Sequence, residues 1–322
     1  MTRVLDAAGT VEVARIERSG MVESRHLGAA AVVDGSGTVI RSAGDPAALI
    51  YPRSTLKPIQ AVAMLRAGAP LSGAALVLAS ASHAGSPEHI AVVESMLASA
   101  GLTADALQCP IDWPLGREFA NQLIRVGARP TRLHMNCSGK HAGFLAAGIH
   151  NGWSTTDYLD PAHPLQVEVR KTVAEFTREP VEHSGTDGCG APVHAVTLAG
   201  LARAIGSITG ATTGEPALLA SAIREHPWAI DGRGRANTIV VEQLGLIAKL
   251  GAEGVMVMGA PSGHAVAVKI LDGSLRAATL VALDLLVEAG VVPRDAAEPV
   301  LEATTERVLG GGLPVGRLVS SL

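Results

Sequence analysis

The sequence predicts an α+β fold in which one antiparallel sheet is built from both ends of the chain and the middle is helical. Two β-branched runs, at 32–33 and 38–40, flank a turn at 34–37 and are typical of a hairpin. Strand patterns return near the other end in "GVMVMG" and "GHAVAVKILDGS". The segments between carry helix patterns, so we expect helices packed against a sheet of terminal strands.

Helix boundaries in the middle are marked by capping residues. Ser86, Pro87 and Gly101 are the cap, first turn and stop of one predicted helix. Another begins close to Ser54, because Pro58 is tolerated only within about the first turn of a helix. Further helices are expected at about 117–126, 138–150, 163–178, 215–225, 236–250 and 275–289.

Composition narrows the class of protein. The 322 residues, 48% of them hydrophobic, can bury a large core, and we expect a single catalytic domain over 1–322. A net charge of −4 and 2% aromatic residues argue against a nucleic-acid partner. No apolar run is long enough for a membrane span, so we expect no membrane association and a cytoplasmic location. Three cysteines indicate free thiols rather than disulfides.

The stretch "YPRSTLKPIQ" places Ser54 three residues before Lys57, with Arg53 beside them. Residues three apart on a helix share a face, so the hydroxyl and the amine can meet. A serine becomes a nucleophile when a neutral amine removes its proton, and burial or a nearby cation favours the neutral amine. The alternative is a helix cap followed by a solvated lysine, but Lys57 precedes an apolar helix and is hard to place on a wet face.

Two further stretches contain thiols. In "HMNCSGKHAGF", Cys137 and Lys140 are again three apart, and the string lacks the residues of a phosphate-binding loop. In "HSGTDGCGAPVHA", Asp187 and Cys189 lie in glycine-rich backbone that can approach a substrate closely. The two thiols could bind a soft metal, although their spacing matches no zinc finger and buried inert cysteines are the alternative.

Two polar loops complete the candidates. Ser82 and His83 precede the helix capped by Ser86, and "IDGRGRANT" carries Asp231, Arg233 and Arg235. Each loop is either an ordinary polar turn or a binding site for a small substrate, since arginine pairs well with a carboxylate. Motifs of zinc proteases, classical esterases and dinucleotide-binding proteins are absent from the sequence.

Six strings, "RSTLKP", "ASHAGSPEH", "NCSGKHAGFL", "DGCGAP", "DGRGRANT" and "KLGAEGV", occur in the order seen in the asparaginase II family, the rhizobial-type L-asparaginases. The chain resembles that family over roughly residues 10 to 320. The resemblance implies hydrolysis of L-asparagine to aspartate and ammonia, on a fold similar to the serine β-lactamases and glutaminases.

The resemblance also implies roles for individual residues. Ser54 would be the nucleophile, Lys57 its base and Ser82 a proton relay, with Arg53 and Lys269 as the cations that favour the neutral amine. Zinc would be held near the active site by Cys137, Lys140 and Cys189, with Asp187 nearby. The family pattern departs at Ala84, where many relatives carry a small hydroxyl residue, and at "GVMVMG", which lacks a fourth cysteine.

For the substrate we expect Arg235 or Arg53 to bind the α-carboxylate, Asp187 to bind the α-ammonium, and main-chain N–H groups around Gly188 to stabilise the oxyanion. A homodimer is the general expectation for such an enzyme. Two alternatives stay open: another serine-lysine amidohydrolase, either a glutaminase or β-lactamase-like, or a non-catalytic protein that binds zinc or an amino acid.

Overall fold

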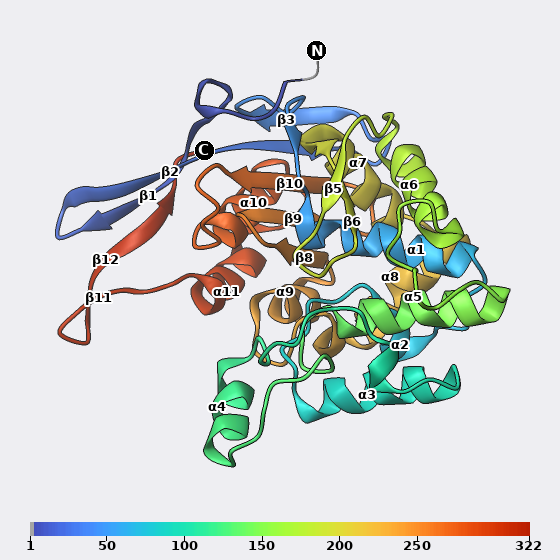
Figure 1. The fold of residues 1–322 in the computed structure, drawn as a ribbon. Helices are drawn as coiled ribbons and strands as arrows, with labels where there is room; N and C mark the ends of the chain where they lie inside the picture. Colours follow the sequence, from blue (N-terminus) through green and yellow to red (C-terminus); the bar gives the residue numbers. More distant parts are fainter. Residues whose placement is uncertain (1–2) are drawn as a thin grey trace.

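In the computed structural model, which describes residues 3–322, strands from the two ends of the chain form one antiparallel sheet (Figure 1). The N-terminal strands, in blue, lie beside the C-terminal strands, in orange and red. The predicted α+β architecture is confirmed, and so is the predicted hairpin, whose two strands are β2 and β3. The sheet order is β11 (Val308–Gly310), β12 (Leu313–Ser320), β1 (Val11–Arg18), β2 (Met21–Val33), β10 (Ala265–Ile270), β9 (Val255–Gly259) and β8 (Ile247–Gly251), with β3 (Val39–Ala43) paired to β2.

Both faces of the sheet are covered, and the strands alternate accordingly. In β9, Met256 and Met258 join the core formed with α10 (Ala278–Glu288) and α11 (Arg294–Thr304). Val255 and Val257 face the opposite core, which contains α7 (Leu198–Thr209). Successive side chains of a strand point to opposite faces, which explains why these strands are apolar throughout.

The helical middle surrounds α1 (Lys57–Arg66), whose first eight residues are all buried. A burial this complete requires neighbours on every side, and α1 contacts α2, α5, α6, α7 and α8. The remaining elements of the middle are η2 (Arg53–Leu56), α2 (Gly73–Ala79), α3 (Pro87–Ser99), η3 (Ala104–Ala106), α4 (Arg117–Arg125), α5 (Ser138–Asn151), α6 (Pro164–Thr177), α8 (Gly214–Glu225), η4 (Pro227–Ile230) and α9 (Ala236–Leu244), with the short strand pairs β4 (Leu49–Ile50) to β7 (Val196–Thr197) and β5 (Ser184–Thr186) to β6 (Pro192–His194).

The prediction of a helix over 236–250 is wrong in its second half. The helix α9 ends at Leu244 because Gly245 adopts a left-handed conformation with φ of 65°, and β8 follows at Ile247–Gly251. The apolar run "LGLIAKLG" fits either a helix or a buried strand by periodicity alone. The structure thus contains a strand, and one side chain on it, Lys249, that the sequence prediction missed.

Among residues 3–322, every helix is too short or too polar to cross a membrane.

Candidate active site

Ser54 and Lys57 lie at the entrance of the central helix. Arg53–Leu56 form the 3₁₀ turn η2, and Lys57 is the first residue of α1. Pro58 therefore occupies the second helical position, where its missing N–H costs little. Arg53 has a φ of 51°, an uncommon conformation for a residue other than glycine, which marks this turn as strained.

The two side chains of this turn lie in different surroundings. The Ser54 side chain is half-buried and forms no hydrogen bond with any group in residues 3–322. Lys57 is 1% exposed, and its Nζ donates to the carbonyl of Ala81 at 2.6 Å and to Ser82 Oγ at 2.9 Å. The Lys57 amine is thus buried, and its hydrogen bonds lead to Ser82 rather than to Ser54.

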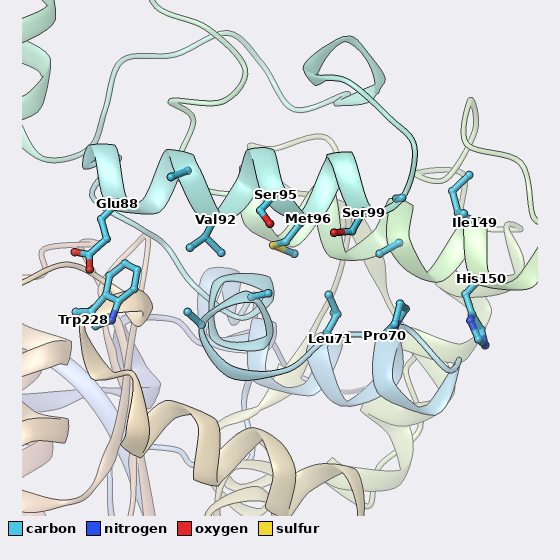
Figure 2. A pocket seen from close by; sticks show the side chains of 15 residues that line it. Pro70, Leu71, Glu88, Val92, Ser95, Met96, Ser99, Ile149, His150 and Trp228 are labelled. Atoms are coloured by element: carbon cyan, nitrogen blue, oxygen red, sulfur yellow. The ribbon is translucent and has the colours of Figure 1, made fainter.

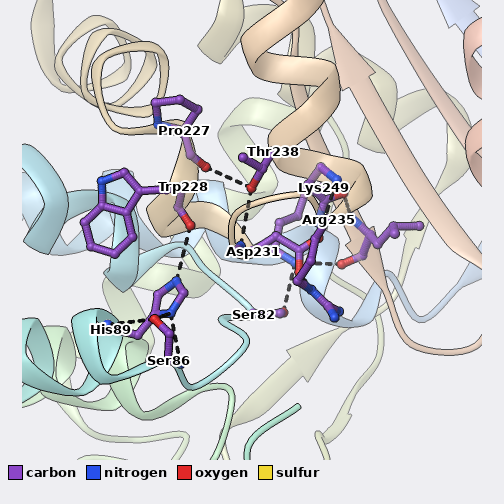
Figure 3. A network of polar contacts seen from close by, with 12 residues as sticks. Ser82, Ser86, His89, Pro227, Trp228, Asp231, Arg235, Thr238 and Lys249 are labelled. Carbon is purple, nitrogen blue, oxygen red and sulfur yellow. Dashed lines mark hydrogen bonds and ion pairs between the residues drawn. The ribbon is translucent and has the colours of Figure 1, made fainter. Parts of the chain in front are cut away.

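A second buried amine reaches the same hydroxyl. Lys249, on β8, is 0% exposed, and its Nζ lies 2.9 Å from Ser82 Oγ and 2.6 Å from the carbonyl oxygen of Leu250 (Figure 3). By strand alternation Lys249 shares the face of Ile247, which belongs to the same core as the helical middle. The Ser82 hydroxyl therefore lies between the amines of Lys57 and Lys249.

Burial, and after it the charge of Lys57, lowers the pKa of Lys249 to about 7. Two ammonium groups sharing one hydroxyl in a buried site repel each other, so one of the two amines is driven toward its neutral form. A neutral Lys249 presents a lone pair to the Ser82 proton. The arrangement can therefore accept a proton near neutral pH.

Strand β8 also lies against the turn that holds the candidate nucleophile. A Cβ placed on Gly251 would come within 2.9 Å of the carbonyl oxygen of Pro52 and 3.2 Å of the Thr55 nitrogen. Only glycine allows this approach, so β8 sits directly beside η2. Three separate segments, η2 with α1, the loop after α2, and β8, thus bring Ser54, Lys57, Ser82 and Lys249 into one region.

Lys269, the cation predicted beside Lys57, lies elsewhere. It is on β10, and its Nζ donates to the main-chain carbonyls of Glu253 and Ile270. Lys269 lies on β10 inside the sheet, between Ala29 of β2 and Val255 of β9. Lys249 lies on the edge strand β8, beside Val257 of β9. The structure therefore brings Lys249, and not Lys269, to the cluster.

Arg53 and Asp187, both predicted to contact substrate, form an ion pair with Arg53 Nε 2.7 Å from Asp187 Oδ1. The same oxygen accepts the Gly188 N–H at 2.9 Å, and the Gly190 N–H donates to the Asp187 carbonyl at 2.8 Å. These two amides are therefore engaged, which argues against the prediction that this loop supplies the oxyanion donors. Arg53 directly precedes Ser54 in the chain, and its side chain holds Asp187 by this ion pair.

Arg235 lies on another side of the cluster. Its Nε donates to Asp231 Oδ1, and the loop that carries Asp231 is tied to the Ser82 loop, because the Ser82 and Ala84 N–H groups donate to the carbonyls of Ile230 and Asp231. Arg235 also lines a cavity of about 310 Å³, together with Ala84. Arg235 therefore lies beside the Ser82 loop and faces a cavity from which a substrate carboxylate could reach it.

A larger cavity, of about 710 Å³, lies between α2, α3 and α5 and contains none of the residues of the cluster (Figure 2). Its lining is largely apolar and includes Leu71, Val92, Met96 and Trp228. Ser54, Lys57, Ser82 and Lys249 line neither this cavity nor the smaller one, whereas Arg235 lines the smaller one.

The predicted metal ligands do converge. Lys140 Nζ donates to Cys189 Sγ at 3.0 Å, and all three of Cys137, Lys140 and Cys189 are buried. The neighbouring Cys137 thiol, and after it the Lys140 ammonium, holds the pKa of Cys189 far below its usual range. Burial is the largest single effect and disfavours the charged form of Lys140, but Cys189, Cys137 and Asp187 together outweigh it, so the pKa of Lys140 is raised. The cluster thus contains a thiolate paired with an ammonium.

A model of the L-asparaginase II family matches residues 14–320. The chain belongs to that family. No curated protein matches the chain. Among solved structures, a β-lactamase from Mycobacterium bovis is similar at 15% identity and a TM-score of 0.44, covering 82% of this chain and 95% of that one. A Bacillus glutaminase is similar at 12% identity and a TM-score of 0.38, covering 82% and 91%. These structural similarities are distant.

In this member of the L-asparaginase II family, the candidate zinc donors are Cys137, Lys140 and Cys189. Within residues 3–322, no three His, Cys, Asp or Glu side chains form a ready metal site. Cys137 and Cys189 are soft donors that suit zinc, and a third protein ligand has to be Lys140. The donor set fits a three-ligand zinc site only after both Cys137 and Lys140, whose pKa values are raised, have given up a proton.

Proposed function

We propose that this protein is an L-asparaginase, which hydrolyses the side-chain amide of L-asparagine through Ser54 within one catalytic domain spanning 1–322. Family membership supports an amidohydrolase acting on a small molecule. The observation that carries the proposal is a series of hydrogen bonds from Lys57 through Ser82 to Lys249, which begins at the residue that follows the Ser54 turn. This hydrogen-bonded series can move a proton, which a protein that only binds an amino acid does not require.

The proposed first step is attack of Ser54 Oγ on the amide carbon. As the C–O bond forms, the electrons of the C=O π bond move onto the carbonyl oxygen. Ser82 gives its proton to the neutral Lys249, the Lys57 ammonium gives one proton to Ser82, and the Lys57 amine, now neutral, takes the Ser54 proton. The links from Lys57 to Ser82 and from Ser82 to Lys249 are the two 2.9 Å contacts. Ser54 lacks a hydrogen bond to Lys57 without substrate, and catalytic hydrogen bonds commonly tighten only in the complex.

The second half of the proposed reaction reverses this path. The C–N bond breaks as a proton returns to the nitrogen, and ammonia leaves an aspartyl ester on Ser54. Water then attacks the ester, its proton follows the same route, and aspartate is released. Because Gly188 and Gly190 are engaged by Asp187, we assign the oxyanion donors to the N–H groups of Arg53 and Ser54 at the start of η2, since the Thr55 and Lys57 N–H groups already donate to the carbonyls of Pro52 and Ser54.

Substrate orientation is assigned to the charges around this turn. Arg235 would bind the α-carboxylate in exchange for part of its contact with Asp231, and Asp187 would bind the α-ammonium beside Arg53. Each arginine is already held by a carboxylate, so the fork is fixed in place before the substrate arrives.

Zinc is proposed as a cofactor held by Cys137, Lys140 and Cys189. When bound, it would supply a fixed positive charge that orients an oxygen of the substrate. Treatment with a chelator is expected to remove about one zinc per chain and to weaken asparagine binding while the melting temperature stays nearly constant. Metal analysis that finds no zinc after purification with added zinc would contradict the assignment.

The experiment that tests the function measures ammonia release from L-asparagine and from L-glutamine, with ring opening of a β-lactam followed in a separate hydrolysis assay. Ser54→Ala, and Lys57→Met as a variant that keeps the buried volume, are expected to lose at least about 10²-fold in kcat. Ser72→Ala and Lys171→Ala, both at exposed positions, are the matched controls and should retain full activity.

Turnover of asparagine by Ser54→Ala at the wild-type rate would refute the nucleophile. Faster release from glutamine than from asparagine would instead identify a glutaminase, the nearest alternative on this site. The expected homodimer is a separate proposal, to be checked by sedimentation.

A further inference from the structure

The strand that carries Lys249 is an edge strand. Strand β8 pairs with β9 only, and β9 lies between β8 and β10. The main-chain groups on the outer side of an edge strand need partners from outside the sheet. At Leu250 these partners are known: its N–H donates to Asn237 Oδ1 at 3.0 Å, and its carbonyl oxygen accepts from Lys249 Nζ at 2.6 Å. One main-chain unit thus joins Asn237 to the Lys249 amine.

Asn237 is itself firmly held. It is the second residue of α9 and is 2% exposed, and its main-chain N–H donates to Asp231 Oδ2 at 3.4 Å. The other oxygen of Asp231 accepts from Arg235, so the first turn of α9 is anchored on a buried carboxylate. The Asn237 side chain therefore projects from a fixed point toward the outer side of β8.

We propose that Asn237 is a positioning residue that fixes the outer edge of β8 and thereby holds the Lys249 amine against Ser82. The kinetic part of this inference rests on the proposed function. Without the Asn237 oxygen, the half-buried Leu250 N–H loses its acceptor, and the strand has to shift or admit water to satisfy it. A shift of about 1 Å at a reacting group can cost about 10²-fold in rate.

Asn237 is neutral, so its effect is one of position rather than charge. The charged and titratable groups that act on Lys249 come from the surrounding elements and are Lys57, Asp231, Cys137 and Arg235. Loss of Asn237 leaves these four in the chain but lets water reach the Lys249 amine. Since burial is the main cause of its lowered pKa, hydration moves that pKa upward, and the acid limb of the activity profile moves with it.

The test compares three variants by pH profile of kcat, KM and melting temperature. Asn237→Ala is expected to lower kcat by about 10²-fold, with little change in KM, and to move the acid limb to higher pH. Asn237→Asp keeps an oxygen for the Leu250 N–H, so kcat on the alkaline plateau should stay within a few-fold of wild type. Its added negative charge should also move the acid limb upward.

Thr238→Val is the matched control. Thr238 is the next residue of α9, fully buried, and its hydroxyl contacts Gly232 and Pro227 rather than β8. This variant should lower the melting temperature but leave the pH profile unchanged. If Asn237→Ala behaves like Thr238→Val, with a stability loss and a wild-type profile, the inference is overturned.

A structural measurement separates this inference from the proposed function. In a crystal structure of Asn237→Ala, the distance from Lys249 Nζ to Ser82 Oγ should exceed hydrogen-bond length, whereas Thr238→Val should preserve the 2.9 Å contact. An unchanged contact in Asn237→Ala refutes the inference. If wild-type protein proves inactive toward asparagine, the proposed function fails, and this distance still decides whether Asn237 positions Lys249.

Discussion

One hydroxyl oxygen, that of Ser82, contacts both buried amines of the site. A hydroxyl has one proton to donate and two lone pairs, so it can accept from a charged Lys57 while donating to a neutral Lys249. Burying a charged lysine without partners costs several kcal/mol, and each amine here also donates to a main-chain carbonyl. The residues are thus arranged so that a single proton can move between them at little cost.

Lys249→Met tests which lysine completes the cluster. Wild-type activity should rise with pH through about 7, because Lys249 accepts a proton only when neutral. The Met variant, which has no proton acceptor, should lose about 10²- to 10⁴-fold in kcat at every pH. Lys269→Met is the comparison: the geometry predicts that it stays active, and the reverse result would restore the assignment made from sequence.

The same lysine has a signature in stability. Its folded pKa of about 7 lies below the unfolded value of about 10.4, so between these values the unfolded chain binds more protons. Stability of the wild type should therefore rise as pH increases from 7 to 10, relative to Lys249→Met, which lacks this group. Urea unfolding of both proteins at pH 7, 8.5 and 10 measures the difference, and a constant difference would contradict the lowered pKa.

At the residue level, the motif strings were sufficient to select Ser54, Lys57 and Ser82 as candidates, and the structure brings Lys57 and Ser82 together. Lys249 was not predicted as a site residue because its segment fits a helix as well as a strand, although it lies within the string "KLGAEGV" that supports the resemblance. Asn237 was not predicted for another reason. Its contact with Leu250 depends on how a helix crosses a strand, which no local pattern encodes.

At the level of elements, the junction between α9 and β8 determines where Lys249 lies. Gly245 adopts a φ of 65°, a conformation that glycine and asparagine tolerate and most other residues do not. Helix boundaries marked by caps were predictable: Ser86 accepts the His89 N–H as expected, and α3 begins at Pro87. The stop at Gly245 was equally visible, but the apolar residues after it obscured the change from helix to strand.

Gly245→Ala is expected to destabilise the protein by about 1 kcal/mol, measured by urea unfolding. No atom lies within 4 Å of the position where its Cβ would be placed, so the cost comes from the backbone conformation alone. Gly245→Asn is the control, since asparagine also occupies this conformation, and it should cost less. Equal losses in both variants would show that the left-handed conformation is not the cause.

At the level of the whole molecule, the last strand and the first strand pair side by side in the sheet. Strand β12 pairs with β1, and Leu318 packs with Ile16 and Val13 in the core on the α10 side of the sheet. The general prediction of a terminus-closed sheet required only strand patterns near both ends. The pairing order could not be predicted, because it depends on contacts between residues at opposite ends of the chain.

Leu318→Ala should lower the free energy of unfolding by about 2 kcal/mol, at the lower end for buried leucines because Leu318 is 7% exposed. Leu309→Ala, at a position 47% exposed on neighbouring β11, should have almost no effect. Chemical denaturation of the two variants provides the comparison. A similar small loss in both would mean that the terminal strand contributes little to the core.

The place of β2 between β1 and β10 has a consequence for synthesis on the ribosome. Strand β2 is made early, but its neighbour β10 emerges only after most of the chain has been translated. Until then, one edge of the nascent hairpin has no native partner, and such edges invite association with other chains. Chaperone dependence of the newly made protein should therefore persist until β10 has been translated and fall once it docks on β2.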